Sequence, residues 1–262
     1  MAVKKPAVAR LVVGVLTTLA VTASCRTPLS KDEAASHPLA QTRRTSGGVI
    51  RGDTMWLNRA DRNRMPEPRE IATSILRSTY VVVVLDCDSN MIALGSAFAL
   101  TEDLLMTNAH VLEGHYAIRV HPVGDRSRRF VVTEFASDRR RDLALLNVPG
   151  LNAHPVEVAF ESPRVGDQIY VAGNPDGLEG SFTDGLVSAY RSFDGCPPVF
   201  QMTAPIAPGS SGGAVVNRRG GVVGVAVGAR GRGENLNFAV RLEELVAFAA
   251  EHGLAHSAAP AR

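Results

Sequence analysis

The 262-residue chain has little of several residue types that would point to particular functions. It has three cysteines, none in a CxxC pair, and no His-rich cluster, so neither a zinc site nor any other metal or cofactor is expected. Its 28 Lys and Arg barely outnumber its 26 Asp and Glu, and they do not gather in a basic stripe. A nucleic-acid partner is therefore not expected.

A long hydrophobic run is also missing, because the N-terminal apolar run, residues 11–21, is too short to span a bilayer comfortably. Basic residues precede it within the first ten positions and small residues follow it at 22–24, which predicts a signal peptide over residues 1–24. Cys25 comes next and resembles the lipidated cysteine of bacterial lipoproteins, although Thr22 stands where Leu is usual. The alternative is ordinary cleavage nearby, with Cys25 incidental. Either way we expect export to the bacterial periplasm or envelope, with membrane contact only through a lipid anchor at Cys25.

The chain then divides into a tether and one domain. Residues 25–68 are rich in Ser, Thr, Arg, Asp and Pro and lack apolar periodicity, which predicts a linker. Trp56 is its exception and is expected to pack on the domain surface. The domain is predicted over residues 69–262, and its first segment, 69–79, has apolar residues at helical spacing.

The rest of the domain has the pattern of an all-β fold. Short apolar segments recur with Gly, Pro, Asn and Asp between them, which leaves no room for the crossover helices of a parallel sheet. A break near 161–166 divides them into two sets of about six, and 241–251 is predicted to be an amphipathic helix. The expected strands are 80–85, 91–100, 103–108, 116–121, 129–135, 143–148, 168–173, 185–192, 198–203, 213–217, 221–229 and 236–240.

A glycine-rich turn at 208–213 (PGSSGG) carries the strongest chemical signal. It places Ser211 between flexible positions just before a predicted strand, and a serine hydroxyl needs a histidine base and an orienting carboxylate to act as a nucleophile. The turn also fits the G-x-S-x-G elbow of α/β-hydrolases, in which an acid and then a histidine follow the serine. Glu234 and His252 formally complete that order. However, β-forming residues follow Ser211 and no Asp does, so the elbow is rejected.

The partners that the serine requires lie upstream. His110 ends a predicted strand in TNAHV, and Asp142 opens another in DLALL, which gives the order His, Asp, Ser of trypsin-like enzymes. Asp138 stands beside three arginines and is interpreted as a solvated loop charge. The other histidines lack the small-residue context of His110 and are interpreted as surface or strand residues: His115, His121 and His154.

Over residues 79–240 the chain closely resembles the HtrA-like branch of trypsin-like serine proteases. The motifs are weak one by one, but their joint occurrence in the family's order is highly specific. They are GSAFAL at 95–100, TNAHV at 107–111, DLALL at 142–146, GNP at 173–175, TDGLVSA at 183–189, APGSSGGAVVN at 207–217 and NFAV at 237–240.

The resemblance implies two six-stranded antiparallel barrels, with a short N-terminal helix, a C-terminal helix and an active site in the cleft between the barrels. His110 is then the general base and acid, Asp142 orients it, and Ser211 is the nucleophile. The oxyanion hole is expected on the turn Gly209, Ser210 and Ser211, with the N–H groups of Gly209 and Ser211 as donors.

The resemblance says less about specificity. It places the pocket walls at Pro205, Ile206, Val225, Ala226, Val227 and Gly228. No acidic residue stands at the base position, Pro205, so a small aliphatic residue is expected before the scissile bond. The family's usual Asn before the nucleophile is Ser210 here, and its usual Pro after the Gly pair is Ala214. No PDZ domain is expected after the last strands.

In double-barrel proteases the loops that hold Cys87 and Cys196 approach each other, so the resemblance and the oxidising compartment predict a disulfide between them. These observations together predict an exported serine endopeptidase acting on polypeptides. The alternative hypothesis is a binding or chaperone-like envelope protein that keeps the fold and turns over little or no substrate.

Overall fold

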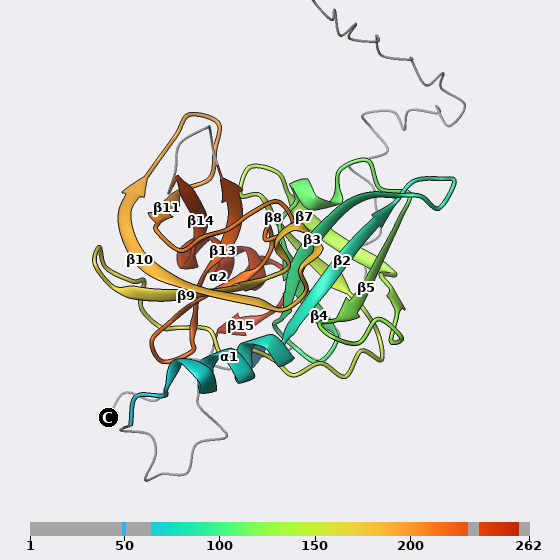
Figure 1. Ribbon diagram of the computed structural model, residues 1–262. Helices are drawn as coiled ribbons and strands as arrows, with labels where there is room; N and C mark the ends of the chain where they lie inside the picture. The colour runs from blue at the N-terminus through green and yellow to red at the C-terminus, as the bar shows by residue number, and fades with distance from the viewer. Residues whose placement is uncertain (1–48, 51–63, 230–235, 257–262) are drawn as a thin grey trace, which may run out of the picture. The chain divides into compact units, whose positions relative to one another are not determined.

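The computed structural model describes residues 49–50, 64–229 and 236–256 (Figure 1). The expected signal peptide, Cys25 and Trp56 lie outside these residues. Within them, no helix is both long and apolar enough to cross a membrane. Short parallel pairing joins β1 (Val49–Ile50) to β15 (Ala255–His256).

Helix α1 (Pro68–Arg77) opens the domain and agrees with the predicted helix to within two residues. Proline at its first position has no N–H to leave unpaired, and the Glu70 carboxylate accepts the N–H of Glu67 at 2.8 Å. Its buried residues, Ile71 and Ile75, lie four positions apart and therefore on one face. That face packs into the core of the barrel described below.

The N-terminal half is one antiparallel sheet with the order β6-β5-β2-β3-β4-β8-β7. The expected closed six-stranded barrel is therefore wrong for this half, whose sheet is open. The predicted strand 129–135 divides into β6, which pairs with β5, and β7, which pairs with β8. The two edge strands, β6 and β7, are consecutive in sequence but are not hydrogen-bonded to each other, so the sheet does not close into a barrel. The strands are β2 (Thr79–Leu85), β3 (Met91–Ala99), β4 (Leu104–Thr107), β5 (Ala117–Pro122), β6 (Phe130–Val131), β7 (Glu134–Asp138) and β8 (Leu143–Asn147).

The C-terminal half is a closed six-stranded barrel with the order β10-β11-β14-β13-β12-β9, as predicted. Strand β10 begins four residues earlier than expected. Residues Ser181 to Leu186 pair with β9 without a break, although Asp184 and Gly185 are residue types common in turns. The strands are β9 (Gln168–Gly173), β10 (Ser181–Arg191), β11 (Val199–Met202), β12 (Ala214–Asn217), β13 (Val222–Ala229) and β14 (Asn237–Arg241).

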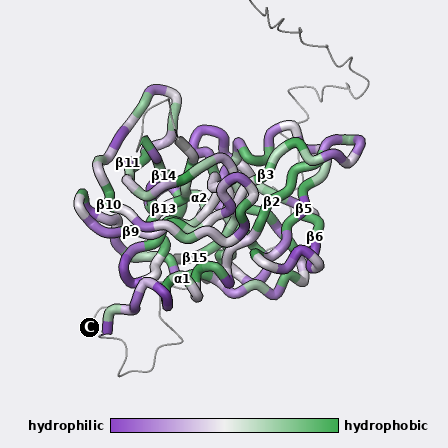
Figure 2. Tube along the Cα trace, in the orientation of Figure 1, coloured by the Kyte–Doolittle hydropathy of each residue, from purple (hydrophilic) through white to green (hydrophobic). Residues whose placement is uncertain are grey.

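Both faces of the central N-terminal strands are buried. Alternate residues of a strand point to opposite faces, and those of β3 enter two different cores. Phe98 packs with the barrel residues, whereas Ala97 and Ala99 belong to the core inside the sheet. Figure 2 shows the result as mostly hydrophobic strands joined by hydrophilic loops. One face of the sheet therefore lies against the barrel.

Helix α2 (Leu242–Glu251) follows β14 and confirms the predicted C-terminal helix. Its buried residues are Leu242, Leu245, Phe248 and Ala249, and they join the barrel core. Asp138, Glu244 and Glu251 all lie within 4 Å of Arg141, which precedes β8. The helix thus belongs to the barrel and also contacts the sheet.

A second polar link between the halves centres on Glu179, in the β9–β10 turn. Its carboxylate lies 3.1 Å from His121 Nε2 on β5 and accepts Arg126 Nε at 2.7 Å. Burial raises the pKa of Glu179, but the hydrogen bonds with His121 and Arg126 outweigh burial and hold it below the usual value.

The substitution Glu179→Gln is expected to lower the free energy of unfolding at neutral pH by about 1 kcal/mol. Because the folded-state pKa is depressed, this contribution is present above the unfolded value of about 4.3 and is lost as the pH falls through the folded value. Urea unfolding of both proteins as a function of pH measures it. A difference that stays constant down to the folded-state pKa would contradict the role given to this carboxylate.

The predicted disulfide between Cys87 and Cys196 is not present in the structure. Cys87 lies in the β2–β3 turn of the sheet, and Cys196 lies in the β10–β11 loop of the barrel. Figure 1 shows the β2–β3 turn and the β10–β11 loop on opposite sides of the molecule.

Candidate active site

His110 and Asp142 form a closely fitted pair in the N-terminal half. Asp142 Oδ2 lies 2.8 Å from His110 Nδ1, and Asp142 Oδ1 accepts the backbone N–H of His110 at 2.9 Å. The imidazole side chain is 41% exposed and the carboxylate only 14%. A carboxylate on Nδ1 leaves Nε2 available as a proton acceptor on the open side.

The backbone of Asp142 is held in an uncommon conformation. Its φ is +53°, in the left-handed region that few residues other than glycine adopt. Asn108 Nδ2 donates to the Asp142 carbonyl at 2.8 Å and so fixes this peptide group from the strand end that carries His110. TNAHV therefore supplies both the histidine and a side chain that orients its partner.

Ser211 lies in the turn between β11 and β12, in the C-terminal half. The residue is 9% exposed, and its Oγ donates to the carbonyl of Val227 at 3.2 Å. Among the residues that the structure describes, Ser211 Oγ bonds to Val227 and His110 Nδ1 to Asp142, and no hydrogen bond joins Ser211 to His110. The hydroxyl must rotate off Val227 before it can reach an imidazole.

The turn presents two unused donors beside this hydroxyl. The N–H groups of Gly209 and Ser211 donate to no acceptor among the residues that the structure describes, whereas the N–H of Ser210 donates to Ala207 at 2.9 Å. The N–H of Ser210, which was not among the expected donors, is thus already engaged. Gly209 has φ +93°, and a Cβ there would lie 2.5 Å from the Asn174 carbonyl, so only glycine fits.

A buried polar network anchors this turn to the sheet. Ser96 Oγ donates to the Gly209 carbonyl at 2.7 Å and accepts the N–H of Asn174 at 2.9 Å and Asn174 Nδ2 at 3.0 Å. The backbone N–H of Ser96 donates to the Ser211 carbonyl at 2.8 Å. Ser96 and Asn174 are fully buried, and burial makes such bonds costly to break.

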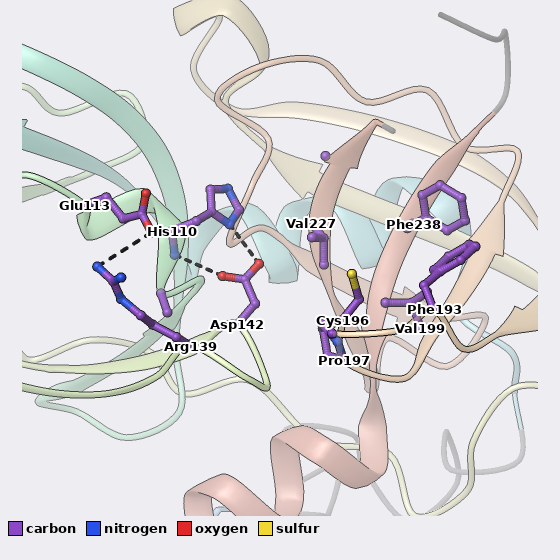
Figure 3. Close-up of a pocket in the computed structure, with 13 residues that line it drawn as sticks. His110, Glu113, Arg139, Asp142, Phe193, Cys196, Pro197, Val199, Val227 and Phe238 are labelled. Atoms are coloured by element: carbon purple, nitrogen blue, oxygen red, sulfur yellow. Dashed lines mark hydrogen bonds and ion pairs between the residues drawn. The ribbon is translucent and has the colours of Figure 1, made fainter. Parts of the chain in front are cut away.

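A cavity of about 360 Å³ opens between the two halves beside the His110–Asp142 pair (Figure 3). Of the expected pocket residues, Val227 and Gly228 line it and the other four do not. Val225 and Ala226 are fully buried in the barrel core, and the β13 register shift lies between Ala226 and Gly228. The wall from the sheet is Ala109, His110, Glu113, Arg139 and Asp142, and the wall from the barrel is Phe193, Gly195, Cys196, Pro197, Val199, Val227, Gly228 and Phe238.

The cavity wall is apolar on the barrel side and polar on the sheet side. Arg139 Nη2 and Glu113 Oε1 lie 3.7 Å apart at its rim, both largely exposed. No group of three or more His, Cys, Asp or Glu side chains that could bind a metal occurs in the described ranges. The functional groups described at the site are the imidazole of His110, the carboxylate of Asp142, the hydroxyl of Ser211 and backbone amides.

Comparison with known proteins agrees with this arrangement. The model of the trypsin-like peptidase domain matches residues 95–225, half of the chain, including all three residues of the predicted triad. The chain belongs to the trypsin-like peptidase family.

Two curated relatives of this peptidase-family chain show which part is shared. A protein named as a DegP-like periplasmic serine endoprotease, from Brucella suis, is 32% identical over 196 residues, which are 72% of this chain and 34% of the relative. A serine protease named HhoB from Synechocystis is 35% identical over 162 residues, which are 57% of this chain and 38% of the relative. The chain thus spans about a third of the length of these relatives.

Solved structures share the fold. A Mycobacterium tuberculosis protease in its active form has a TM-score of 0.63 at 25% identity, covering 74% of this chain and 90% of that one. A serine endoprotease from Yersinia pestis has a TM-score of 0.63 at 23% identity, covering 71% and 66% respectively.

The site contains residues to which sequence reasoning gave no role. Ser96 and Asn174 stand in two of the quoted motifs, GSAFAL and GNP, and Asn108 stands in TNAHV. Their signal is a small polar residue in an otherwise apolar buried segment, since such a residue must find a hydrogen-bond partner. Which partner it finds depends on the fold.

Gly212, next to the hydroxyl-bearing serine, allows a direct test of how tightly the turn is packed. Its φ is +85°, and a Cβ would lie 2.1 Å from the Ser96 carbonyl oxygen and 2.3 Å from Thr107 Oγ1. Gly212→Ala is expected to lower the free energy of unfolding by about 3 kcal/mol or more, from strain and overlap together. Urea denaturation measures the loss.

Gly220→Ala is the matched control, because Gly220 has a similar φ of +84° but no atom within 4 Å of an added Cβ. Only backbone strain, about 1 kcal/mol, is expected there. Equal losses for the two variants would show that the Ser96 contact does not constrain the turn.

Proposed function

We propose that this protein is a serine endopeptidase in which His110, Asp142 and Ser211 form the catalytic triad. The observation that carries the proposal is the double contact of the Asp142 carboxylate with His110, which orients Nε2 toward the open side. His110 would take the proton of Ser211 as that oxygen attacks the substrate carbonyl. It would then return the proton to the leaving amine, and water would release the acyl group.

The two unused N–H groups, on Gly209 and Ser211, would stabilise the negative oxygen of the tetrahedral intermediate. Such a donor typically contributes about 3 to 4 kcal/mol in comparable enzymes. The buried Ser96 network holds their turn against the sheet, so the donors need little rearrangement during the reaction.

The contact of Ser211 with Val227 favours a second candidate, a binding protein with the peptidase fold and little turnover. Incubation with an unfolded polypeptide, followed by mass spectrometry, separates the two. The peptidase proposal requires internal fragments that are absent with Ser211→Ala protein. An intact polypeptide bound by both proteins would support the binding protein and overturn the peptidase.

The substrates would be polypeptides, and the place of action the bacterial periplasm or envelope. Relatives named as periplasmic and the signal-peptide pattern at residues 1–24 support this location. The preference for a small aliphatic residue before the scissile bond stays a prediction, and profiling with a peptide library tests it.

A further inference from the structure

Asp142 needs external support to hold its conformation. A left-handed residue other than glycine is strained by about 1 kcal/mol or more and persists only where its surroundings fix it. Asn108 fixes the carbonyl side of the residue. The N-terminal side is the peptide from Arg141, whose backbone N–H donates to Asp138 and whose side chain is held by carboxylates of helix α2.

Arg141 is engaged by more carboxylates than any neighbouring arginine. Its Nη1 and Nη2 donate to the two carboxylate oxygens of Glu251 at 2.6 and 2.7 Å. Glu244 Oε2 lies 3.4 Å from its Nε, and Asp138 Oδ2 lies 3.7 Å from its Nη1. Hydrogen bonding to Glu251 raises the pKa of Arg141 and lowers that of Glu251. Bidentate arginine–carboxylate pairs within a network are the ion pairs that best fix the position of a side chain.

The ion pairs run from one half of the molecule to the other. Arg141 lies in the β7–β8 turn of the sheet, whereas Glu244 and Glu251 lie on α2, which is anchored in the barrel core by Leu245 and Phe248. The side chain of Arg141 is 23% exposed, against 80% for that of Arg139. The rigid element that holds Arg141 is therefore α2.

Asp138 completes the turn. Its Oδ1 accepts the N–H groups of Arg140 at 2.8 Å and Arg141 at 3.3 Å. The sequence interpretation of Asp138 as a solvated loop charge is thus wrong, since the side chain is only 22% exposed and organises the turn from within.

We propose that Arg141 is a positioning residue, through which helix α2 fixes Asp142 and thereby the imidazole of His110. The inference rests on the proposed function for its effect on catalysis, but the orientation of the His110–Asp142 pair is measurable without turnover. Loosening α2 at Glu251 should therefore disturb a hydrogen bond on the far side of the β7–β8 turn.

The test uses Arg141→Met, which keeps an unbranched stem, and Glu251→Gln, which removes the helix-borne charge. The low-field proton NMR signal of the His110 ring N–H shared with Asp142 should broaden or shift in both, more strongly in Arg141→Met. In peptide hydrolysis, kcat should fall about tenfold or more in Arg141→Met. KM should stay within about twofold, since no substrate contact is lost. Arg141→Lys should recover only part of kcat, because an ammonium cannot bind both oxygens.

Glu243→Gln is the matched control on the same helix. Glu243 accepts Ser162 Oγ, away from the β7–β8 turn, so this change removes the same charge from α2 without touching Arg141. Arg140→Met controls for the loss of an exposed arginine one position away. Both should keep the wild-type signal and kcat.

The result that would overturn the inference is an unchanged His110 signal in folded Arg141→Met and Glu251→Gln proteins. Equal changes in Glu243→Gln and Glu251→Gln would also overturn it, because they would indicate general loosening of the helix. A wild-type protein that hydrolyses nothing, yet shows the selective signal change, would refute the proposed function and leave this inference standing.

Discussion

Ser211→Ala is expected to lower kcat for peptide hydrolysis by about a millionfold, the loss that follows removal of the nucleophile in a triad. The remaining rate should be that of the oxyanion donors and substrate binding alone. Folding should be unaffected, because the hydroxyl makes one hydrogen bond, to Val227, and the side chain shrinks by a single atom. Initial rates with a fluorogenic peptide, at saturating concentration, measure the change.

Ser162→Ala provides the control, since Ser162 is a half-buried serine whose Oγ donates to Glu243. It should retain the wild-type kcat. A Ser211→Ala protein that retains more than about a thousandth of the wild-type rate would show that another group performs the attack.

Asp142→Asn is expected to lower kcat by about ten-thousandfold while leaving the fold intact. Both carboxylate oxygens accept N–H groups of His110, one from the backbone and one from the ring. An amide has only one oxygen. If that oxygen keeps the backbone N–H, the amide NH2 faces Nδ1 and forces the ring proton onto Nε2, where it blocks proton acceptance from Ser211. Steady-state kinetics at neutral pH measure the loss.

Asp167→Asn is the matched control, because Asp167 accepts the N–H of Arg164 in an exposed turn of the barrel. No change in kcat is expected from it. If Asp142→Asn were as active as this control, the orientation of His110 would not depend on the carboxylate.

Much of the fold could be predicted from local pattern. Strands and helices follow apolar periodicity, and the ends of β8 and β13 agree with the expected segments to within one residue. The open N-terminal sheet could not be predicted, because it depends on which neighbour each half of the segment 129–135 pairs with. Each half pairs with the strand next to it along the chain, β6 with β5 and β7 with β8, and the residues between the halves, Val132 and Thr133, include no Gly, Pro, Asn or Asp that would mark a turn.

The candidate site divides in the same way. Short motifs with a known order contain His110, Asp142 and Ser211, so the sequence alone was enough to predict these residues as a triad. The interpretation of Asp138 as a solvated loop charge is wrong because Asp138 is paired with Arg141. Arg141 is in turn held by Glu251, which lies 110 positions further along the chain and is not evident from the local sequence. The predicted disulfide between Cys87 and Cys196 is absent for a related reason. The positions of two loops in a family do not fix the distance between two side chains in one member.

The site of covalent modification by a fluorophosphonate tests the nucleophile most directly. The reagent reacts with a serine whose hydroxyl can be activated, so wild-type protein should take up one label. Tandem mass spectrometry of the fragment containing the adjacent Ser210 and Ser211 should place it on Ser211. Asp142→Asn protein should label far more slowly. A label on Ser210, or none under conditions in which the protein is folded, would contradict Ser211 as the activated nucleophile.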